Sequence, residues 1–345
     1  MADEDEDFSF GGKTGKTAGE NPEPAASSQP SAEAAPEISM TGVETAVPVS
    51  TDPDIPAHMV RDADAPRRSA FSRASNDLWA ALSNWTLWWR LSLLDIRSRY
   101  RRTVIGPFWS VLSVAILVVA LGFVYALLWK VPYETYLPYF AAGYVTWVFI
   151  TSVMNEHAGS FIAGANIIRS MTLPVTLHIV RPLFKNILIF FHALTVYVVA
   201  ALALRYQLEQ PLALLLAPVG LVILSANLLW IGIVLAVLCS RFRDFIQVVI
   251  SVLQIAFFIT PIFWYRTELL QDLNGDNIEA ERGLADLILA NCNPFYHLVE
   301  VVRGPLIGHV PEPITYIVTL SAAVIGLGFA LFILGRSRGR IAYWV

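Results

Sequence analysis

Four arginines lie close together just ahead of a long apolar run: Arg97, Arg99, Arg101 and Arg102. A guanidinium group is always charged and binds phosphate oxygens through paired hydrogen bonds. At the edge of a membrane, these side chains can therefore reach the phosphates of lipid headgroups. The alternative is that they only follow the excess of Lys and Arg that membrane proteins keep on one side of the bilayer.

The residues before these arginines predict the element that positions them. Apolar side chains recur every three or four residues, which places them on one stripe of a helix. They are Trp79, Leu82, Trp85, Trp89, Leu93, Ile96 and Tyr100. Such a helix is expected to lie in the membrane interface with its tryptophans at headgroup depth. The alternative is that the stripe packs against protein.

The composition predicts the larger structure that this helix borders. The chain of 345 residues is 55% hydrophobic and 15% charged, and its mean hydropathy is +0.55. Several apolar runs approach the ~20 residues that a helix needs to cross a bilayer. They cover residues 108–129, 137–154, 187–204, 212–238, 245–264 and 314–334. The sequence therefore predicts an all-α polytopic membrane protein, with six transmembrane helices in residues 108–345 and both termini on one side.

The positive charges between the predicted spans indicate which side that is. From Arg90 onward, 13 Lys and Arg lie on the side of the termini and 5 on the opposite side. An excess of Lys and Arg marks the cytoplasmic side. Both termini are therefore expected in the cytoplasm.

The residues before the interface helix have a different composition. Residues 1–64 contain 14 Asp and Glu against 3 Lys and Arg, a net charge of −11, and they are rich in Pro, Ala and Ser. Such a segment buries too little apolar surface to offset the entropy of the chain. Residues 1–73 are predicted to form a disordered acidic cytoplasmic tail. Residues 74–107 are assigned to the interface helix and the basic segment that follows it.

The sequence contains no phosphate-binding loop for ATP. Gly15-Lys16-Thr17 resembles the end of such a loop, but Phe10 stands where the motif needs its first glycine. The chain is therefore expected to carry no cofactor of its own. Any chemistry of ATP and magnesium is assigned to a partner subunit.

Two loops on the cytoplasmic side carry candidate functional residues. In the first, the run from Asn166 to Arg169 is weakly amphipathic and is followed by Pro174, which predicts a short helix presented to a docking partner. In the second, Arg243 and Asp244 are predicted to hold a tight turn between two spans.

Aromatic side chains gather where the chain re-enters the membrane after the first span. They are Tyr136, Tyr139, Tyr144 and Trp147. Tyr and Trp at this depth usually form an interfacial belt, but their rings can also stack on sugars. Gln254 lies inside the fifth span, cannot face lipid without cost, and is expected to face a partner helix or a transport path.

The largest external segment, residues 265–313, is predicted to form two short helices, one of which re-enters the membrane. Its acidic cluster lacks the spacing of a calcium-binding loop, so no metal site is predicted. Cys239 and Cys292 are expected on opposite sides of the membrane, where they cannot form a disulfide.

Five of these segments together resemble one known family. They are RSRYRRTVIGPFW before the first span, NIIRSMTLP in the first cytoplasmic loop, SRFRDF before the fifth span, NPFYHLVEVVRGPLIG outside and RSRGRIAYWV at the end. These segments are similar to the permease subunits of ABC transporters that export polysaccharides such as O-antigen, capsule or teichoic acid. The resemblance covers about residues 75–345, and the acidic tail falls outside it.

The resemblance implies a homodimer of six-span subunits in the bacterial inner membrane, joined to two separate ATP-binding subunits. It implies an interface helix at about residues 84–100, lying on membrane lipids, and a coupling helix at about residues 161–172. The residues expected to contact the ATP-binding subunit are Asn166, Ile168, Arg169 and Met171.

The substrate implied is a lipid-linked polysaccharide and not a nucleic acid. The four arginines would attract the diphosphate of this lipid. The side chains expected to line a glycan path are Tyr100, Trp109, Tyr136, Tyr139, Tyr144, Trp147 and Gln254.

Two other classes of function stay open from the sequence. An ABC exporter of a drug or small lipid would share the architecture, with less reason for the basic interface and the aromatic rings. An integral membrane enzyme acting on glycans would need paired carboxylates or a His and Asp constellation. The external acidic cluster is the one candidate for that chemistry, so we expect a transporter subunit rather than an enzyme.

Overall fold

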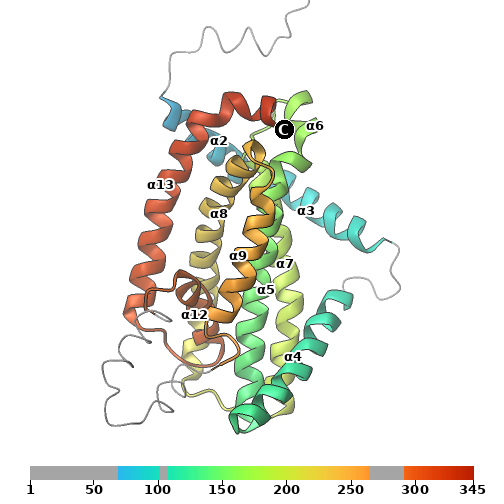
Figure 1. Cartoon of the computed structure of the whole chain (residues 1–345), viewed down its shortest axis with the longest axis vertical. Coiled ribbons are helices and arrows are strands. Elements are labelled where there is room, and N and C mark those ends of the chain that lie inside the picture. Colours follow the sequence, from blue (N-terminus) through green and yellow to red (C-terminus); the bar gives the residue numbers. More distant parts are fainter. Residues whose placement is uncertain (1–68, 102–107, 265–290) are drawn as a thin grey trace, which may run out of the picture. The chain divides into compact units, whose positions relative to one another are not determined.

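The computed structural model describes residues 69–101, 108–264 and 291–345. All regular secondary structure in these residues is helical (Figure 1), which confirms the predicted all-α fold. The elements are α2 (Ala70–Ser83), α3 (Trp85–Tyr100), α4 (Phe108–Trp129), α5 (Tyr133–Ala163), α6 (Ala165–Ser170), α7 (Leu177–Ala203), the 3-10 helix η1 (Pro211–Leu216), α8 (Ala217–Arg241), α9 (Phe245–Ile259), α12 (Pro294–Leu306) and α13 (Pro313–Trp344).

Five helical segments are long and apolar enough to cross a membrane: α4, α5, α7, η1 with α8, and α13. The fifth predicted span, α9, has 15 residues and ends at Ile259 instead of position 264. It ends there because Pro261 has no backbone N–H and disfavours helical geometry at Thr260. The described residues thus show five full-length spans and one shorter apolar helix, rather than six full-length spans.

Several helices continue beyond the apolar runs that predict them. α5 extends to Ala163, α7 begins at Leu177 and α13 extends to Trp344. Charged residues such as Lys185 and Arg338 end an apolar run, but Lys and Arg favour helical structure and do not end a helix. The spans therefore carry helical extensions into the polar region.

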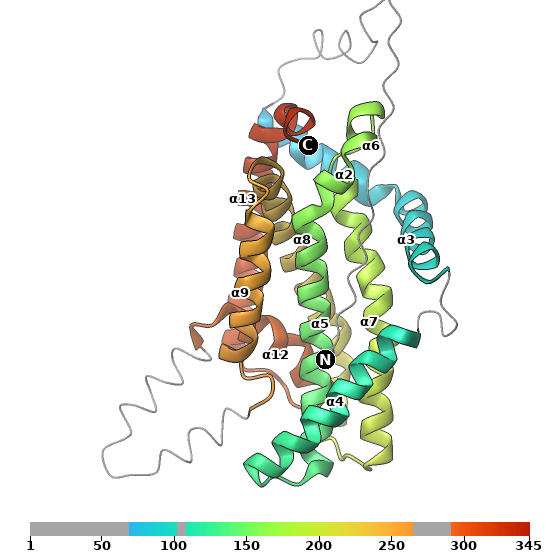
Figure 2. The ribbon, with the colours of Figure 1, turned by 45° about the vertical axis from the view of Figure 1, so that its right-hand side comes forward.

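α5 is the central helix of the bundle. It contacts α4, α7, α8, α9 and α12, and Figure 2 shows it between α9 and α7. In its most apolar window 72% of the residues are buried, against 22% to 44% in the other four spans. Its largest buried side chains include Tyr136, Phe140 and Ile150. The sides of α5 therefore face protein, whereas the other spans keep wide exposed apolar faces.

A second apolar cluster lies at one end of the bundle, where α2, α7, α8 and α13 meet. Leu78 of α2, Leu177 of α7 and Leu334 of α13 are buried in it. α2 and α13 approach closely, because a Cβ on Gly335 would be 2.2 Å from the carbonyl oxygen of Ala70. The first and last described helices are therefore packed together at this end, which also holds α6 (Figure 1).

The predicted interface helix is two helices, α2 and α3, with a break at Asn84. The Ser83 and Asn84 side chains donate hydrogen bonds to the carbonyl oxygens of Trp79 and Ala80, at 2.6 and 2.7 Å. Such side chains compete with the helical backbone, and Asn84 leaves helical geometry, with ψ at 53°. The single continuous stripe expected from Trp79 to Tyr100 is therefore interrupted.

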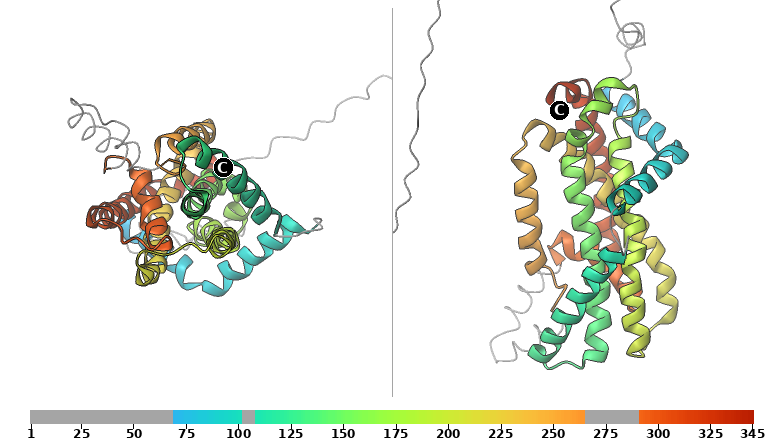
Figure 3. Two further views of the ribbon diagram at one scale, coloured as in Figure 1. Left: turned by 90° about the horizontal axis from the view of Figure 1, so that it is seen from below. Right: turned by 90° about the vertical axis from the view of Figure 1, so that its right-hand side faces the viewer.

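The two helices present tryptophans away from the protein. Trp79 and Trp85 are 73% and 62% exposed, whereas Trp88 stacks on Phe184 of α7 with ring centroids 3.7 Å apart. In the view from below in Figure 3, α3 is seen lengthwise while spans such as α5 and α7 are seen nearly end-on, so α3 runs across these spans. This orientation is the one expected of an interface helix.

α2 starts earlier than the sequence indicates. Its first residue is Ala70, and the hydroxyl of Ser69 caps it by accepting a hydrogen bond from the Ser72 N–H at 3.2 Å. The helix therefore begins within residues 1–73, which the sequence assigns to the tail. Residues 1–68 lie outside the described residues.

Candidate functional site

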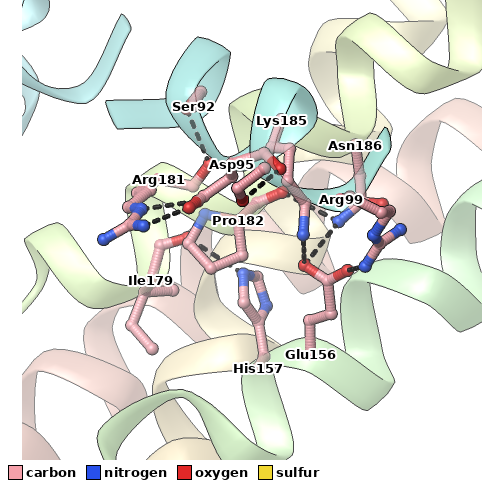
Figure 4. Close-up of polar contacts among 11 residues, drawn as sticks. Ser92, Asp95, Arg99, Glu156, His157, Ile179, Arg181, Pro182, Lys185 and Asn186 are labelled. Carbon is pink, nitrogen blue, oxygen red and sulfur yellow. Dashed lines mark hydrogen bonds and ion pairs between the residues drawn. The ribbon is translucent and has the colours of Figure 1, made fainter. Parts of the chain in front are cut away.

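An ion pair between α3 and α7 joins the basic segment to the bundle. The Arg181 Nε donates to one Asp95 carboxylate oxygen at 2.6 Å, and a second nitrogen of the guanidinium contacts the other oxygen (Figure 4). The Ser92 hydroxyl, one turn earlier, donates to the Arg181 carbonyl oxygen at 3.0 Å. A bidentate pair fixes orientation as well as distance. α3 is therefore held against α7 in one register.

Glu156 of α5 accepts hydrogen bonds from three donors at the same junction (Figure 4). One carboxylate oxygen accepts from Arg99 of α3 at 3.0 Å. The other accepts from Lys185 and, at 3.1 Å, from Asn186 of α7. The Lys185 side chain is 9% exposed, so its charge depends on Glu156 for compensation. Glu156 therefore ties α3, α5 and α7 together.

The four predicted phosphate-binding arginines have different surroundings. Arg97 and Arg101 are exposed, and neither pairs with a carboxylate of the described residues. The Arg99 side chain is 50% exposed but is bonded to Glu156. Arg102 lies outside the described residues. Among the three described arginines of this group, those whose charge is open to an anionic ligand are therefore Arg97 and Arg101.

The aromatic side chains predicted to line a glycan path are divided between interior and surface. Tyr136, Tyr139 and Trp147 are buried, so other residues of the same chain cover their rings, and their role in a path stays a prediction. Tyr144 is partly buried and packs against this core. Two of the predicted residues are exposed: Trp109 and Gln254. The Tyr100 side chain lies outside the described part of the chain.

The buried tyrosines bond the backbone where α9 ends. The Tyr136 hydroxyl donates to the Phe263 carbonyl oxygen. The Tyr139 hydroxyl lies 3.5 Å from the Pro261 carbonyl oxygen and 3.4 Å from that of Trp264. Non-helical backbone among membrane spans must find its hydrogen-bond partners within the protein. The two tyrosines of α5 therefore serve as hydrogen-bond partners for the non-helical backbone that follows α9.

Arg303 of α12 completes this set of contacts. Its Nε donates to Glu300 at 2.9 Å, another guanidinium nitrogen donates to the Pro261 carbonyl oxygen, and its charge lies 4.6 Å from the centre of the Tyr139 ring. A Cβ on Gly143 would be 3.2 Å from the Arg303 side chain, so glycine makes room for it. This pair was not predicted from the sequence, although a Glu and an Arg three residues apart in an apolar helix signal it.

α6 is shorter than the coupling helix expected at about residues 161–172. α5 continues to Ala163, α6 begins at Ala165, and the chain becomes extended at Met171. The residues expected to contact an ATP-binding subunit are mostly exposed. Asn166, Arg169 and Met171 are exposed, and Ile168 is half-buried against the second apolar cluster.

Arg169 links α6 to the end of α13. Its Nε lies 3.4 Å from the carbonyl oxygen of Ala342, and a second guanidinium nitrogen donates to that of Val345. The sequence does not signal this contact, because the partners are backbone atoms at the far end of the chain.

The turn between α8 and α9 is held by backbone hydrogen bonds. The carbonyl oxygens of Arg243 and Asp244 accept from Ile246 and Gln247 at 3.2 and 3.1 Å. Both charged side chains are exposed, and no ion pair joins them in this part of the chain. The two residues therefore shape the turn through their backbone and not through a mutual salt bridge.

No group of three or more His, Cys, Asp or Glu residues in the described residues could hold a metal ion. The acidic cluster of the external segment lies outside those residues. Cys239 and Cys292 are both free cysteines.

The fold and the charged junction define a multi-pass helical membrane protein with α3 docked on its spans. The family described as "ABC-2 type transporter" matches residues 83–273, more than half of the chain, and the chain belongs to this family.

Two curated relatives are both named "O-antigen export system permease protein RfbA", from Klebsiella pneumoniae. They are 27% and 26% identical to this chain over 175 residues. The match covers 49% of this chain and 65% of each relative, so the chain spans slightly less than two thirds of their length.

Proposed function

We propose that this chain is the membrane-spanning subunit of an ABC exporter that moves a lipid-linked polysaccharide across the bacterial inner membrane. Membership of the ABC-2 type transporter family carries the proposal, and the similarity to two O-antigen export permeases supports the class of substrate. Two copies of the chain would form the pathway, with their termini in the cytoplasm. A separate subunit would bind ATP and magnesium.

In this proposal, Arg97 and Arg101 make the first contact with the phosphates of the lipid carrier. Both lie at the end of α3 and are exposed. The ion pairs of Asp95 and Arg99 hold α3 in place without using these two side chains. Guanidinium groups bind phosphate through charge-assisted hydrogen bonds, which contribute about 1.5–3 kcal/mol each. A docked helix with two free arginines is suited to select a phosphorylated carrier.

The test replaces both arginines and measures export. Arg97→Gln with Arg101→Gln is expected to lower the polysaccharide on the cell surface about tenfold or more, because two charge-assisted hydrogen bonds are lost. Arg90→Gln is the matched control, since Arg90 is exposed on the same helix. Recovery of the complex from membranes should be unchanged in all variants. Normal export by the double variant would exclude the phosphate role.

The class of exporter is tested separately on the purified complex. Recovery of an ATP-hydrolysing subunit with this chain, and stimulation of hydrolysis by the glycan lipid, support the proposal. Stimulation by small lipids or drugs instead would favour the small-molecule exporter. Recovery of the chain without an ATP-hydrolysing partner would reject an ABC exporter and return attention to a membrane enzyme.

A further inference from the structure

Asp77 of α2 is a buried carboxylate that contacts two other segments of the chain. Its side chain is 1% exposed. Its oxygens accept hydrogen bonds from the Val175 and Thr176 N–H groups at 3.3 and 2.9 Å and from the Thr176 hydroxyl at 2.8 Å. One oxygen also pairs with Arg338 of α13 at 2.9 Å. Asp77 therefore joins α2, the segment between α6 and α7, and α13.

A carboxylate is rarely placed in such a position without full compensation. Burial of a charge is unfavourable unless hydrogen bonds and an opposite charge offset it. Asp77 has both, and it also lies just ahead of the N-terminus of α7, where the helix dipole favours negative charge. Loss of the carboxylate charge would therefore weaken the contacts of α2 to both other segments at once.

The segment that Asp77 holds is the connection leaving α6. α6 ends at Ser170, and Val175 and Thr176 lie just before α7 begins at Leu177. The other side of this connection is fixed to α13 as well, through Arg169 and the carbonyl oxygens of Ala342 and Val345. The segment from Arg169 to Thr176 is thus linked to α13 at both ends. Arg169 contacts α13 directly, and Thr176 is linked to it through Asp77.

α2 is also fixed directly to α13. The Ala70 carbonyl oxygen leaves no room for a side chain at Gly335, and Leu78 shares the second apolar cluster with Leu334 and Ile341. α2, the α6–α7 connection and the end of α13 therefore form one packed unit, with Asp77 as its shared ionic contact.

We propose that Asp77 and Arg338 are positioning residues that transmit movement of α6 to α2 and to the transmembrane helix α13. This inference rests on the proposed function, in which α6 docks on an ATP-binding subunit. A push on α6 then moves the end of a span and the interface helices together. Without the Asp77 contacts, ATP hydrolysis continues but moves the spans less effectively.

The test compares ATP hydrolysis with export for the full chain in complex with its ATP-binding subunit. Asp77→Asn and Arg338→Gln are expected to leave hydrolysis by the purified complex unchanged. Both should lower the host's surface polysaccharide, per amount of complex, about fivefold or more, the usual size of a coupling effect. The double variant should be no worse than Asp77→Asn, because both changes remove the same contact.

The controls separate transmission from simple stability. Arg340→Gln changes an exposed arginine two residues further along α13, whose guanidinium donates to the Arg336 carbonyl oxygen of the same helix, and it should behave like the unmodified chain. If Asp77→Asn does not fold, the result for Arg338→Gln is used instead, because in that variant the Asp77 carboxylate keeps its hydrogen bonds from Val175 and Thr176.

Three outcomes would overturn the inference. Hydrolysis and export could fall together in proportion to the complex recovered, which would make Asp77 a stabilising residue only. Both quantities could stay unchanged, which would remove any role in transmission. If the unmodified chain recovers no ATP-hydrolysing subunit, the proposed function fails and the inference fails with it.

Discussion

Arg303 and Glu300 show what a buried ion pair does in this protein at the scale of single residues. Their side chains are 4% and 10% exposed, and Arg303 also binds the Pro261 carbonyl oxygen. The pair therefore joins α12 to the chain that leaves α9. Removal of one partner would leave the other charge buried without compensation.

Glu300→Gln is expected to destabilise the protein by about 3–5 kcal/mol, the usual cost of breaking a buried pair from one side. Glu209→Gln is the control, because the Glu209 side chain is 76% exposed and surface substitutions usually change stability by less than about 0.5 kcal/mol. Thermal unfolding of the purified protein in one detergent measures both. Equal unfolding midpoints would contradict the role of the pair.

The ion pairs at the α3–α5–α7 junction could not be predicted from the sequence. Asp95 and Arg181 are 86 residues apart, and Arg99 and Glu156 are 57 apart. The sequence indicates that a charge beside an apolar run needs a partner or water, but the packing of the helices decides which partner it meets. The four arginines were therefore recognised as a group, whereas the structural role of Arg99 was not.

At the scale of helices, glycine determines how closely α13 approaches α8. A Cβ on Gly326 would be 2.3 Å from the ring of Trp230. Two residues later on α13, a Cβ on Gly328 would have no described atom within 4 Å. The two positions therefore form a matched pair on one helix.

Gly326→Ala is expected to destabilise the protein by about 1–3 kcal/mol, because the added methyl must displace a packed indole ring. Gly328→Ala is expected to be neutral, or to stabilise by up to about 1 kcal/mol, since alanine favours helix over glycine. The same unfolding measurement distinguishes them. A similar effect at both sites would mean that α8 and α13 are not in close contact.

The positions of the helices were predicted better than their ends. The predicted starts at Phe108 and Phe245 agree with α4 and α9, because turns or proline precede these apolar runs. The hydrophobic period missed the break at Asn84, because the period of Trp79 and Trp85 continues across it, whereas the interface helix implied by the resemblance, at about residues 84–100, agrees with α3. The hydrophobic pattern indicates which face of a helix is apolar. Whether the helix continues is decided here by the local hydrogen bonds of the Ser83 and Asn84 side chains.

At the scale of the whole molecule, different groups gather at the two ends of α8. The second apolar cluster with α2 and α13 surrounds its last turns at Val237, whereas α12 packs on its beginning and on η1. We propose that the end of α8 that packs with α2 and α13 is cytoplasmic. The two ends should then respond differently to reagents that do not cross membranes.

A membrane-impermeant maleimide is expected to label Cys292, which is exposed, from the outside in spheroplasts. In a variant without Cys292, Tyr343→Cys, at a side chain that is 83% exposed, should be labelled in inverted vesicles and not in spheroplasts. Cys239 is buried and should react in neither spheroplasts nor inverted vesicles. The absence of labelling in a variant that lacks Cys292 tests this. Labelling of Tyr343→Cys from the outside would reverse the proposed topology.

The short length of α9 bears on the lipid around the protein. Its 15 residues extend about 22 Å at 1.5 Å per residue, less than the hydrocarbon thickness of about 30 Å in a typical bilayer. The chain beyond it is bonded to α5 and α12 through the Pro261 and Phe263 carbonyl oxygens, so α9 has no simple way to lengthen. Where lipid borders this helix, we expect the bilayer to adapt to its shorter hydrophobic length by thinning locally.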